Sequence, residues 1–248
     1  MNILVCISNV PDTTTKVKFK EDNTRFNDEG VQWIINPWDE LALTRALELK
    51  EQSGKIDSIT VLNVGEKVSE ATLRKALAVG ADKAVRINTF PQDAYSVAGE
   101  MAEYIKNESF DIILTGIESS DYNNSAVGGM LAELLELPSV SSVSALNISD
   151  NGVELKREIE GGQETLSIPT PFVGIVQKGI AIEPRIPAMR GIMMARKKPL
   201  EVKEPSGKEP QVSYASFELP PEKGDCKKYD TENVEQLIDD LDKEAKIL

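Results

Sequence analysis

The sequence has 248 residues, a formal net charge of -13 and no histidine. The acidic balance argues against general nucleic-acid binding, which requires a basic surface. Without histidine the chain lacks the usual general base, the Ser-His and Cys-His nucleophile pairs and most transition-metal sites. Carboxylates, lysine or a cofactor could still support catalysis, but this absence favours binding or electron transfer.

The N-terminus opens directly into an apolar strand over residues 2–8 and leaves no room for an export signal or an arginine-rich transit peptide. No apolar run is long enough to cross a membrane, so direct membrane insertion is not expected. The two cysteines, Cys6 and Cys226, suggest neither a disulfide framework nor a zinc site. We therefore expect a cytoplasmic protein.

Strands and helices alternate along the first half of the chain. Apolar runs typical of strands buried on both faces occur at 3–7, 59–64, 84–87 and 112–114. Helical periodicity runs from the turn at 36–40 to Gly54, and again over 69–78, 93–106 and 126–137. This alternation predicts an α/β fold with a doubly wound, mostly parallel sheet covered on both faces. Two short stretches, 17–20 and 31–35, predict a hairpin-like excursion before the first helix.

A small-polar loop follows the strand at 112–114, and the pattern turns helical from Ala126. Such a loop lies at the carboxyl edge of a parallel sheet, where ligands bind at a topological switch point. Free amides at the start of the next helix favour an anion such as a phosphate, and Asn123, Asn124 and Ser125 could add hydrogen bonds. The same composition also fits an ordinary strand-to-helix turn. Trp38 is interpreted either as a packed residue or as part of a ligand wall.

The pattern changes after Pro138. Three segments without intervening helices predict antiparallel strands added to the sheet, at 140–148, 153–159 and 164–168, and 172–176 returns as a buried strand. The segment 183–198 combines methionines with arginines and lysines. A methionine-rich patch with a basic rim is typical of a docking surface. A helix with inward-packed methionines and solvated lysines fits the pattern equally well.

The last fifth of the chain has little apolar core. Residues 201–213 predict a linker or an extended arm, and 212–219 a further strand. Asn233 is expected to cap an amphipathic helix, which has no sheet of its own to cover and so should pack on a partner. We expect an α/β domain over 1–199, which includes the segment 183–198, and a C-terminal arm over 200–248.

Several motifs resemble those of one known family. The run REIEGGQETL at 157–166, five residues ahead of Pro171, closely resembles the signature of electron-transfer flavoprotein β-subunits. The family's downstream segment is similar to EPR at 183–185, IM at 192–193 and ARKK at 195–198. Further motifs fall in the family's order, namely VPD at 10–12, NP at 36–37, AVGAD at 78–82 and the segment 116–130. The resemblance covers essentially the whole chain.

The resemblance implies a heterodimer in which a homologous α-subunit holds most of a catalytic FAD and is embraced by the C-terminal arm of this chain. It implies an electron carrier rather than an enzyme. Electrons would come from flavoprotein dehydrogenases, such as the acyl-CoA dehydrogenases of fatty acid β-oxidation, and would pass to a quinone-linked or other acceptor.

The resemblance also implies a second nucleotide site, which the family fills with AMP or, in its bifurcating branch, with a second FAD. The matching residues are Cys6, Asn36, Pro37, Trp38, Asp39, Asn63, Val64, Gly116, Ser119, Asp121, Asn123, Asn124, Ser125, Ala126 and Val127. Thr13 and Trp38 match positions near the isoalloxazine ring of the α-bound FAD. Tyr122 to Ser125 match neither the acidic run of AMP-binding members nor the bifurcating motif. Because the bifurcating motif is missing, AMP is favoured.

Met189 falls at the family's leucine that anchors partner dehydrogenases. The predicted docking surface consists of Arg185, Met189, Arg190, Ile192, Arg196, Lys197 and Lys198. Two alternatives come from other classes. A stand-alone nucleotide-binding stress-type protein would share the alternating half of the fold but would not need the region after Pro138. A nucleotidyl-transferring enzyme would want a glycine-rich Ser loop with a nearby lysine, and 116–125 has neither.

Overall fold

A nine-stranded sheet forms the core of the protein in the computed structural model, which describes residues 1–150 and 152–247. The strands lie in the order β11-β10-β9-β12-β8-β1-β6-β7-β13. Those that pair in parallel at the centre are β1 (Asn2–Cys6), β6 (Ser58–Val64), β7 (Lys83–Ile87), β8 (Ile112–Gly116) and β12 (Phe172–Val176). Their apolar runs are buried on both faces, as expected for a central parallel sheet.

Five helices cover the described part of this sheet: α1 (Pro37–Ser53), α2 (Glu70–Val79, preceded by the 3-10 turn η1 at Lys67–Ser69), α3 (Ala94–Ile105), α4 (Val127–Leu135) and α5 (Met189–Ala195). The chain runs from β1 to β6 and β7 on one side, and then crosses back through α3 to β8 on the other side of β1. The direction of winding therefore reverses beside β1, and this is the position at which ligands bind in such sheets.

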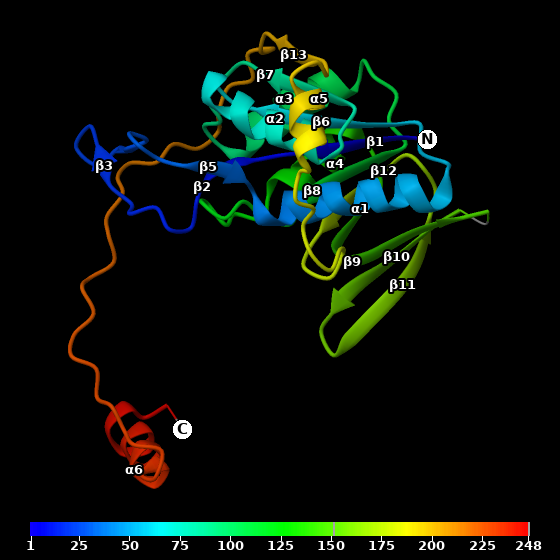
Figure 1. Cartoon of the computed structure of the whole chain (residues 1–248). Coiled ribbons are helices and arrows are strands. Elements are labelled where there is room, and N and C mark those ends of the chain that lie inside the picture. Colours follow the sequence, from blue (N-terminus) through cyan, green and yellow to red (C-terminus); the bar gives the residue numbers. More distant parts are fainter. Residues whose placement is uncertain (151, 248) are drawn as a thin grey trace. The chain divides into compact units, whose positions relative to one another are not determined.

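Two apolar layers fill the space between the sheet and its helices. On one face Ile3 and Val5 pack with Leu43 of α1 and Leu73 of α2. On the other face Leu4 and Cys6 belong to the cluster that contains residues of α3 and α4. Figure 1 shows α1 and α5 in front of the sheet. The alternation of faces along β1 confirms the doubly wound α/β architecture predicted from the sequence.

The strands after Pro138 extend the sheet at one edge. They are β9 (Ser139–Ser149), β10 (Gly152–Ile159) and β11 (Gly162–Ile168), and β10 pairs antiparallel with both of its neighbours. β9 joins the central sheet by parallel pairing with β12. The predicted antiparallel addition is confirmed.

The predicted hairpin between 17–20 and 31–35 is wrong in its pairing. β3 (Phe19–Lys20) pairs with β4 (Arg25–Phe26), whereas β5 (Trp33–Ile35) pairs with β2 (Asn9–Pro11). The chain reverses directly after β3 because Glu21, Asp22 and Asn23 all adopt positive φ angles. That tight reversal provides β3 with a local partner before the chain reaches β5.

The segment after residue 199 is less of a free linker than its composition indicates. β13 (Leu200–Lys203) adds a parallel edge strand beside β7. Glu100 of α3 then accepts hydrogen bonds from the main-chain N–H groups of residues 206–208, and Asp93 accepts those of Gln211 and Val212. The strand predicted at 212–219 does not form, and the N–H of Val212 at its start donates to Asp93.

The described chain divides into two compact units. The larger unit comprises residues 1–16 and 28–215, and the smaller one comprises 17–27 and 216–247. In the smaller unit the rings of Phe19 and Phe217 stack with centroids 5.4 Å apart. Its helix α6 (Val234–Asp240) continues into the π-helical turn η2 (Leu241–Ala245), and α6 buries none of its residues. Among the described residues, no helix combines the length and the apolar character needed to span a bilayer.

Candidate nucleotide site and docking surface

The carboxyl ends of three adjacent strands bring together most of the predicted nucleotide-site residues. Cys6 ends β1, Asn63 and Val64 end β6, and Gly116 ends β8. The start of α1 lies at the same edge, because Asp39 and Asn36 contact the ends of both β1 and β8. The ends of β1, β6 and β8 and the start of α1 therefore form one edge of the sheet, which is called the strand-end site below.

Asn36 joins the start of α1 to the loop after β8. An asparagine that precedes a helix normally caps its own first turn, but the Asn36 side chain makes no such bond. Its Nδ2 donates instead to the carbonyl oxygen of Glu118 (2.8 Å), and its Oδ1 accepts from the main-chain N–H of Ser120 (3.1 Å). The buried amide thus holds the first turn of the nucleotide loop, residues 116–126, against α1.

Asp39 makes a second link at the same place. One carboxylate oxygen accepts from the N–H of Ser8 (2.7 Å), and the other accepts from the N–H of Gly116 (2.8 Å). The carboxyl is buried, and burial raises its pKa to about 7 even though these hydrogen bonds favour the charged form. Burial also raises the pKa of the Cys6 thiol, and the charge of Asp39 adds to this effect. Cys6 is consequently a packed, unreactive thiol.

The raised pKa of Asp39 predicts a pH-dependent stability. An unfolded aspartate titrates near 3.9, so between about pH 4 and pH 7 the native protein binds more protons here than the unfolded chain. The contribution of Asp39 to the free energy of unfolding therefore decreases as the pH rises through this window, by up to about 1.4 kcal/mol per unit. In Asp39→Asn, urea unfolding at pH 5 and pH 7 should reveal a smaller decrease than in the wild type. Equal decreases in the two proteins would rule this out.

The nucleotide loop is tightly folded. Asn123 and Ser125 adopt positive φ angles, the N–H of Asn123 donates to the carbonyl oxygen of Ser119 (2.9 Å), and Ser125 Oγ donates to Glu118 (3.2 Å). Burial raises the pKa of the Asp121 carboxyl. Ala126 precedes α4 but supplies no side-chain cap, so the first-turn amides of α4 retain donors for an anion.

Buried side-chain polar atoms without a hydrogen-bond partner among the described residues lie at or next to three of the strand ends, on Asn63, Arg86 and Thr115. Asn63 Nδ2 donates to the carbonyl oxygen of Ile7 (2.8 Å), which leaves Asn63 Oδ1 as an unused acceptor at the end of β6. Thr115 Oγ1 lies one residue before the end of β8, and Arg86 Nε lies one residue before the end of β7. Buried polar groups normally have partners, so the unused Asn63 oxygen suits a ligand that brings a hydrogen-bond donor to the end of β6.

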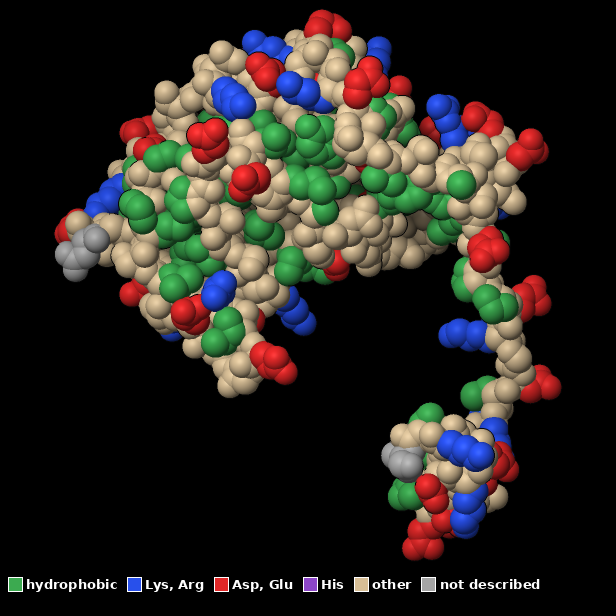
Figure 2. Space-filling view, turned by 180° about the vertical axis from the view of Figure 1, so that it is seen from behind, with side chains coloured by type: hydrophobic (Ala, Val, Ile, Leu, Met, Phe, Trp, Pro, Cys, Tyr) green, Lys and Arg blue, Asp and Glu red, His purple; other side chains and the backbone are tan. Residues whose placement is uncertain are grey.

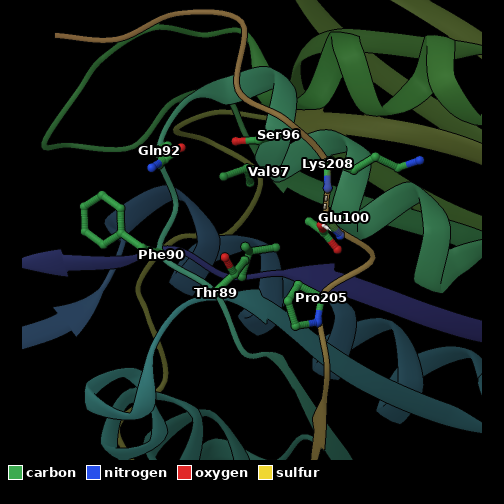
Figure 3. Close-up of a pocket in the computed structure, with 10 residues that line it drawn as sticks. Thr89, Phe90, Gln92, Ser96, Val97, Glu100, Pro205 and Lys208 are labelled. Carbon is green, nitrogen blue, oxygen red and sulfur yellow. Dashed lines mark hydrogen bonds between the residues drawn. The ribbon is translucent and has the colours of Figure 1, made fainter.

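A shallow pocket adjoins this edge (Figure 3). Its lining consists of Val64, Thr89, Phe90, Gln92, Ser96, Val97, Glu100, Pro205, Gly207 and Lys208. Figure 3 also shows the hydrogen bonds between Glu100 and the segment that closes one side of the pocket. Of the predicted nucleotide-site residues, only Val64 lines it.

Thr13 and Trp38, the two positions assigned to the flavin, have different surroundings. Thr13 is exposed in a turn where Asp12 accepts hydrogen bonds from the N–H and the hydroxyl of Thr14. Trp38 is half-buried in the first turn of α1, against Gly116. Trp38 therefore packs at the end of β8, and its place in a ligand wall stays a prediction.

The docking surface predicted at 183–198 contains α5. Its apolar side chains point outward, since Met189 is 76% exposed and Met193 is 68% exposed. The alternative in which these methionines pack inward is wrong, because the only buried residue of α5 is Ala195. Arg190, Ile192, Arg196 and Lys197 are exposed, whereas Arg185 and Lys198 are half-buried and bonded to other parts of the chain.

Two contacts at the site come from residues that sequence reasoning missed. The ring of Tyr122 in the nucleotide loop packs on Tyr214, with centroids 5.2 Å apart, and Asn124 lies 3.5 Å from the Tyr214 hydroxyl. Ser8 supplies one of the N–H groups that hold Asp39. No signal in the sequence joins Tyr214 to a loop some 90 residues earlier.

Comparison with known proteins agrees with this arrangement. Residues 24–207 match the profile of the electron transfer flavoprotein domain, so the fold and this match define the class of protein as an electron transfer flavoprotein. The chain is 36% identical to the electron transfer flavoprotein subunit beta of Bacillus subtilis over an alignment that covers 100% of both chains. The subunit beta of Dictyostelium discoideum is 32% identical (100% of this chain, 99% of that one), and that of Homo sapiens is 30% identical (90% of each). This chain belongs to the electron transfer flavoprotein β-subunit family.

Proposed function

We propose that this chain is the β-subunit of a heterodimeric electron carrier. It would accept electrons from flavoprotein dehydrogenases, such as acyl-CoA dehydrogenases, and pass them to a quinone-linked or other acceptor. The observation that supports this proposal best is the outward-facing methionine helix with arginines and lysines around it. An apolar knob with a charged rim favours fast association and rapid dissociation, as a carrier between several proteins requires.

We propose two nucleotide ligands. An FAD, held mostly by the α-subunit, supplies the redox chemistry, and Thr13 and Trp38 of this chain would form part of the wall around its ring. AMP, rather than a second FAD, would occupy the strand-end site. The first-turn amides of α4 would bind its phosphate, and the unused Asn63 oxygen would accept from a donor of the nucleoside. The chain's own role is to bind, orient and exclude water, and no residue is assigned as an acid, a base or a nucleophile.

The α-subunit needs a surface other than the one used by dehydrogenases. Figure 2 shows the side of the larger unit that faces away from the viewer of Figure 1, where apolar side chains gather in the middle and charged ones lie mostly toward the margins. We propose that a face of this kind and the predicted C-terminal arm, 200–248, contact the α-subunit. A cytoplasmic location of the heterodimer stays a prediction.

Co-purification tests the proposed function. The chain is expressed together with an α-subunit encoded in the same genome, and the complex is analysed by absorbance and by mass spectrometry of the ligands it releases. We expect a yellow heterodimer that contains FAD and AMP. A colourless homodimer that holds ATP would instead support the stress-type protein, and release of pyrophosphate from ATP would support the nucleotidyl-transferring enzyme.

A further inference from the structure

The docking helix α5 is too short to be stable by itself. It has seven residues, and isolated helices of fewer than about 12 residues are marginal in water. It also exposes most of its apolar side chains, so burial of its own surface contributes little to its stability. Something else in the fold must hold it in place.

The C-terminal end of the docking segment, residues 183–198, is held by hydrogen bonds to α2. Arg74 of α2 donates from Nη1 to the carbonyl oxygens of Ala195 and Lys198, both at 2.8 Å. In return, Lys198 Nζ donates to the carbonyl oxygens of Ala81 (2.7 Å), Leu77 (3.0 Å) and Gly80 (3.3 Å) at the end of α2. Arg74 of α2 thus binds carbonyl groups at and just after the end of α5, and Lys198, which follows α5, binds those at and just after the end of α2, where cations are favoured.

Helices α2 and α5 also approach each other closely along their length. A Cβ atom at Gly191 would overlap the main-chain carbonyl oxygen of Ala78, so only glycine allows this contact. Ala195 is buried against the same core layer as α2. The inner side of α5 is therefore fixed by backbone contact, and its methionines can face outward without loosening it.

The other end of the segment is held on α1. The guanidinium of Arg185 pairs with the two carboxylate oxygens of Glu51 at 2.7 and 2.5 Å, and the main-chain N–H of Arg185 donates to Thr44 Oγ1 (3.1 Å). This planar, two-point geometry is specific to arginine. The exposed residues Ile186, Met189 and Met193 lie between the two attachments.

We propose that Lys198 and Arg185 are positioning residues that hold the docking helix in its binding conformation, and that they do not themselves contact the dehydrogenase. This inference rests on the proposed function, because it concerns the surface that the dehydrogenase would use. A preorganised segment pays no ordering entropy when it binds. We call the contacts of Lys198 with the end of α2 and of Arg185 with Glu51 the clamp. Loss of the clamp weakens binding of the dehydrogenase but leaves electron transfer within the formed complex unchanged.

The test compares Lys198→Met with Lys197→Met in the purified heterodimer. Both variants remove one positive charge, but Lys197 is exposed, whereas Lys198 donates three hydrogen bonds. The first readout is hydrogen–deuterium exchange of peptides that cover 186–198. We expect about tenfold faster exchange in Lys198→Met, the order expected for loss of charged hydrogen bonds, and no change in Lys197→Met.

The second readout is steady-state reduction of the heterodimer by an acyl-CoA dehydrogenase from the same organism. Lys198→Met should raise the KM for the heterodimer about tenfold and leave kcat unchanged, and Lys198→Arg should restore part of the loss. Unchanged exchange in Lys198→Met would overturn the clamp, as would equally faster exchange in Lys197→Met. A wild-type heterodimer that the dehydrogenase cannot reduce would overturn the proposed function instead, and the exchange data would still decide whether the clamp exists.

Discussion

Replacing Gly116 with alanine is expected to destabilise the protein by about 3 kcal/mol, because an added methyl group has no room in a packed site that is also hydrogen-bonded. The new Cβ would overlap a carboxylate oxygen of Asp39, and it would lie 2.8 Å from Cβ of Trp38 and 3.2 Å from the amide nitrogen of Asn36. All three neighbours belong to the start of α1. To make room, α1 must move away from β8 and give up the hydrogen bond from the Gly116 N–H to Asp39.

The matched control is Gly129→Ala in α4. A Cβ at Gly129 meets no atom within 4 Å, and alanine favours a helix by up to about 1 kcal/mol over glycine. Urea unfolding should therefore give a lower midpoint for Gly116→Ala and an equal or higher one for Gly129→Ala. Mass spectrometry should find the nucleotide depleted in Gly116→Ala relative to the wild type. A Gly116→Ala protein with the wild-type midpoint would contradict the packing described for this edge.

The second large effect is expected at the docking surface. Met189→Ala should lower the rate constant for reduction of the heterodimer by its dehydrogenase, measured at low concentration, by about tenfold, because a methionine side chain that is buried on binding contributes roughly 1.5–3 kcal/mol. Met189→Asp should lower it further, since a charge would replace the apolar knob. The FAD content should not change in either variant, because Met189 is 76% exposed on α5 and makes no contribution to the core.

Met130→Ala provides the control for that experiment. Met130 is also an exposed methionine, but it lies on α4, on the opposite side of the sheet from α5. Stopped-flow reduction should therefore be slowed by Met189→Ala and not by Met130→Ala. If both variants are reduced at the wild-type rate, Met189 is not the anchor.

The fold was largely predictable because buried parallel strands and their covering helices have distinct periodicities. The four apolar runs of the first half and the helices between them lie close to their predicted bounds. β13 escaped prediction because Leu200–Lys203 carries two charged residues in four, and an edge strand does not need an apolar run. The orientation of α5 was open because its pattern fits both an inward and an outward face, and only the contact of Gly191 with Ala78 decides between them.

The candidate site was predictable in its members but not in its connections. Proline and acidic residues at 36–40 predicted a helix start, and α1 begins at Pro37. The same residues gave no indication that Asn36 bonds a carbonyl group 82 residues away, because hydrogen bonds across a sheet depend on which strands are neighbours. The resemblance to a known family supplied positions for the nucleotide, but it gave no indication of the Tyr122–Tyr214 contact.

Glu100 and Asp93 hold the segment 206–212 mostly through its main-chain N–H groups, and the Ser206 side chain adds a further hydrogen bond to Glu100. Every amino acid except proline carries such a group, so these main-chain bonds do not depend on which side chains the segment bears, and side chains matter chiefly at Ser206, at Gly207 with its φ of +85° and at Lys208, which pairs with Glu103 of α3. Most residues of the segment 206–212 can therefore be substituted during evolution while its length and its path over α3 stay constant. In related proteins, Glu100 and Asp93 should be better guides to this attachment than the residues they hold.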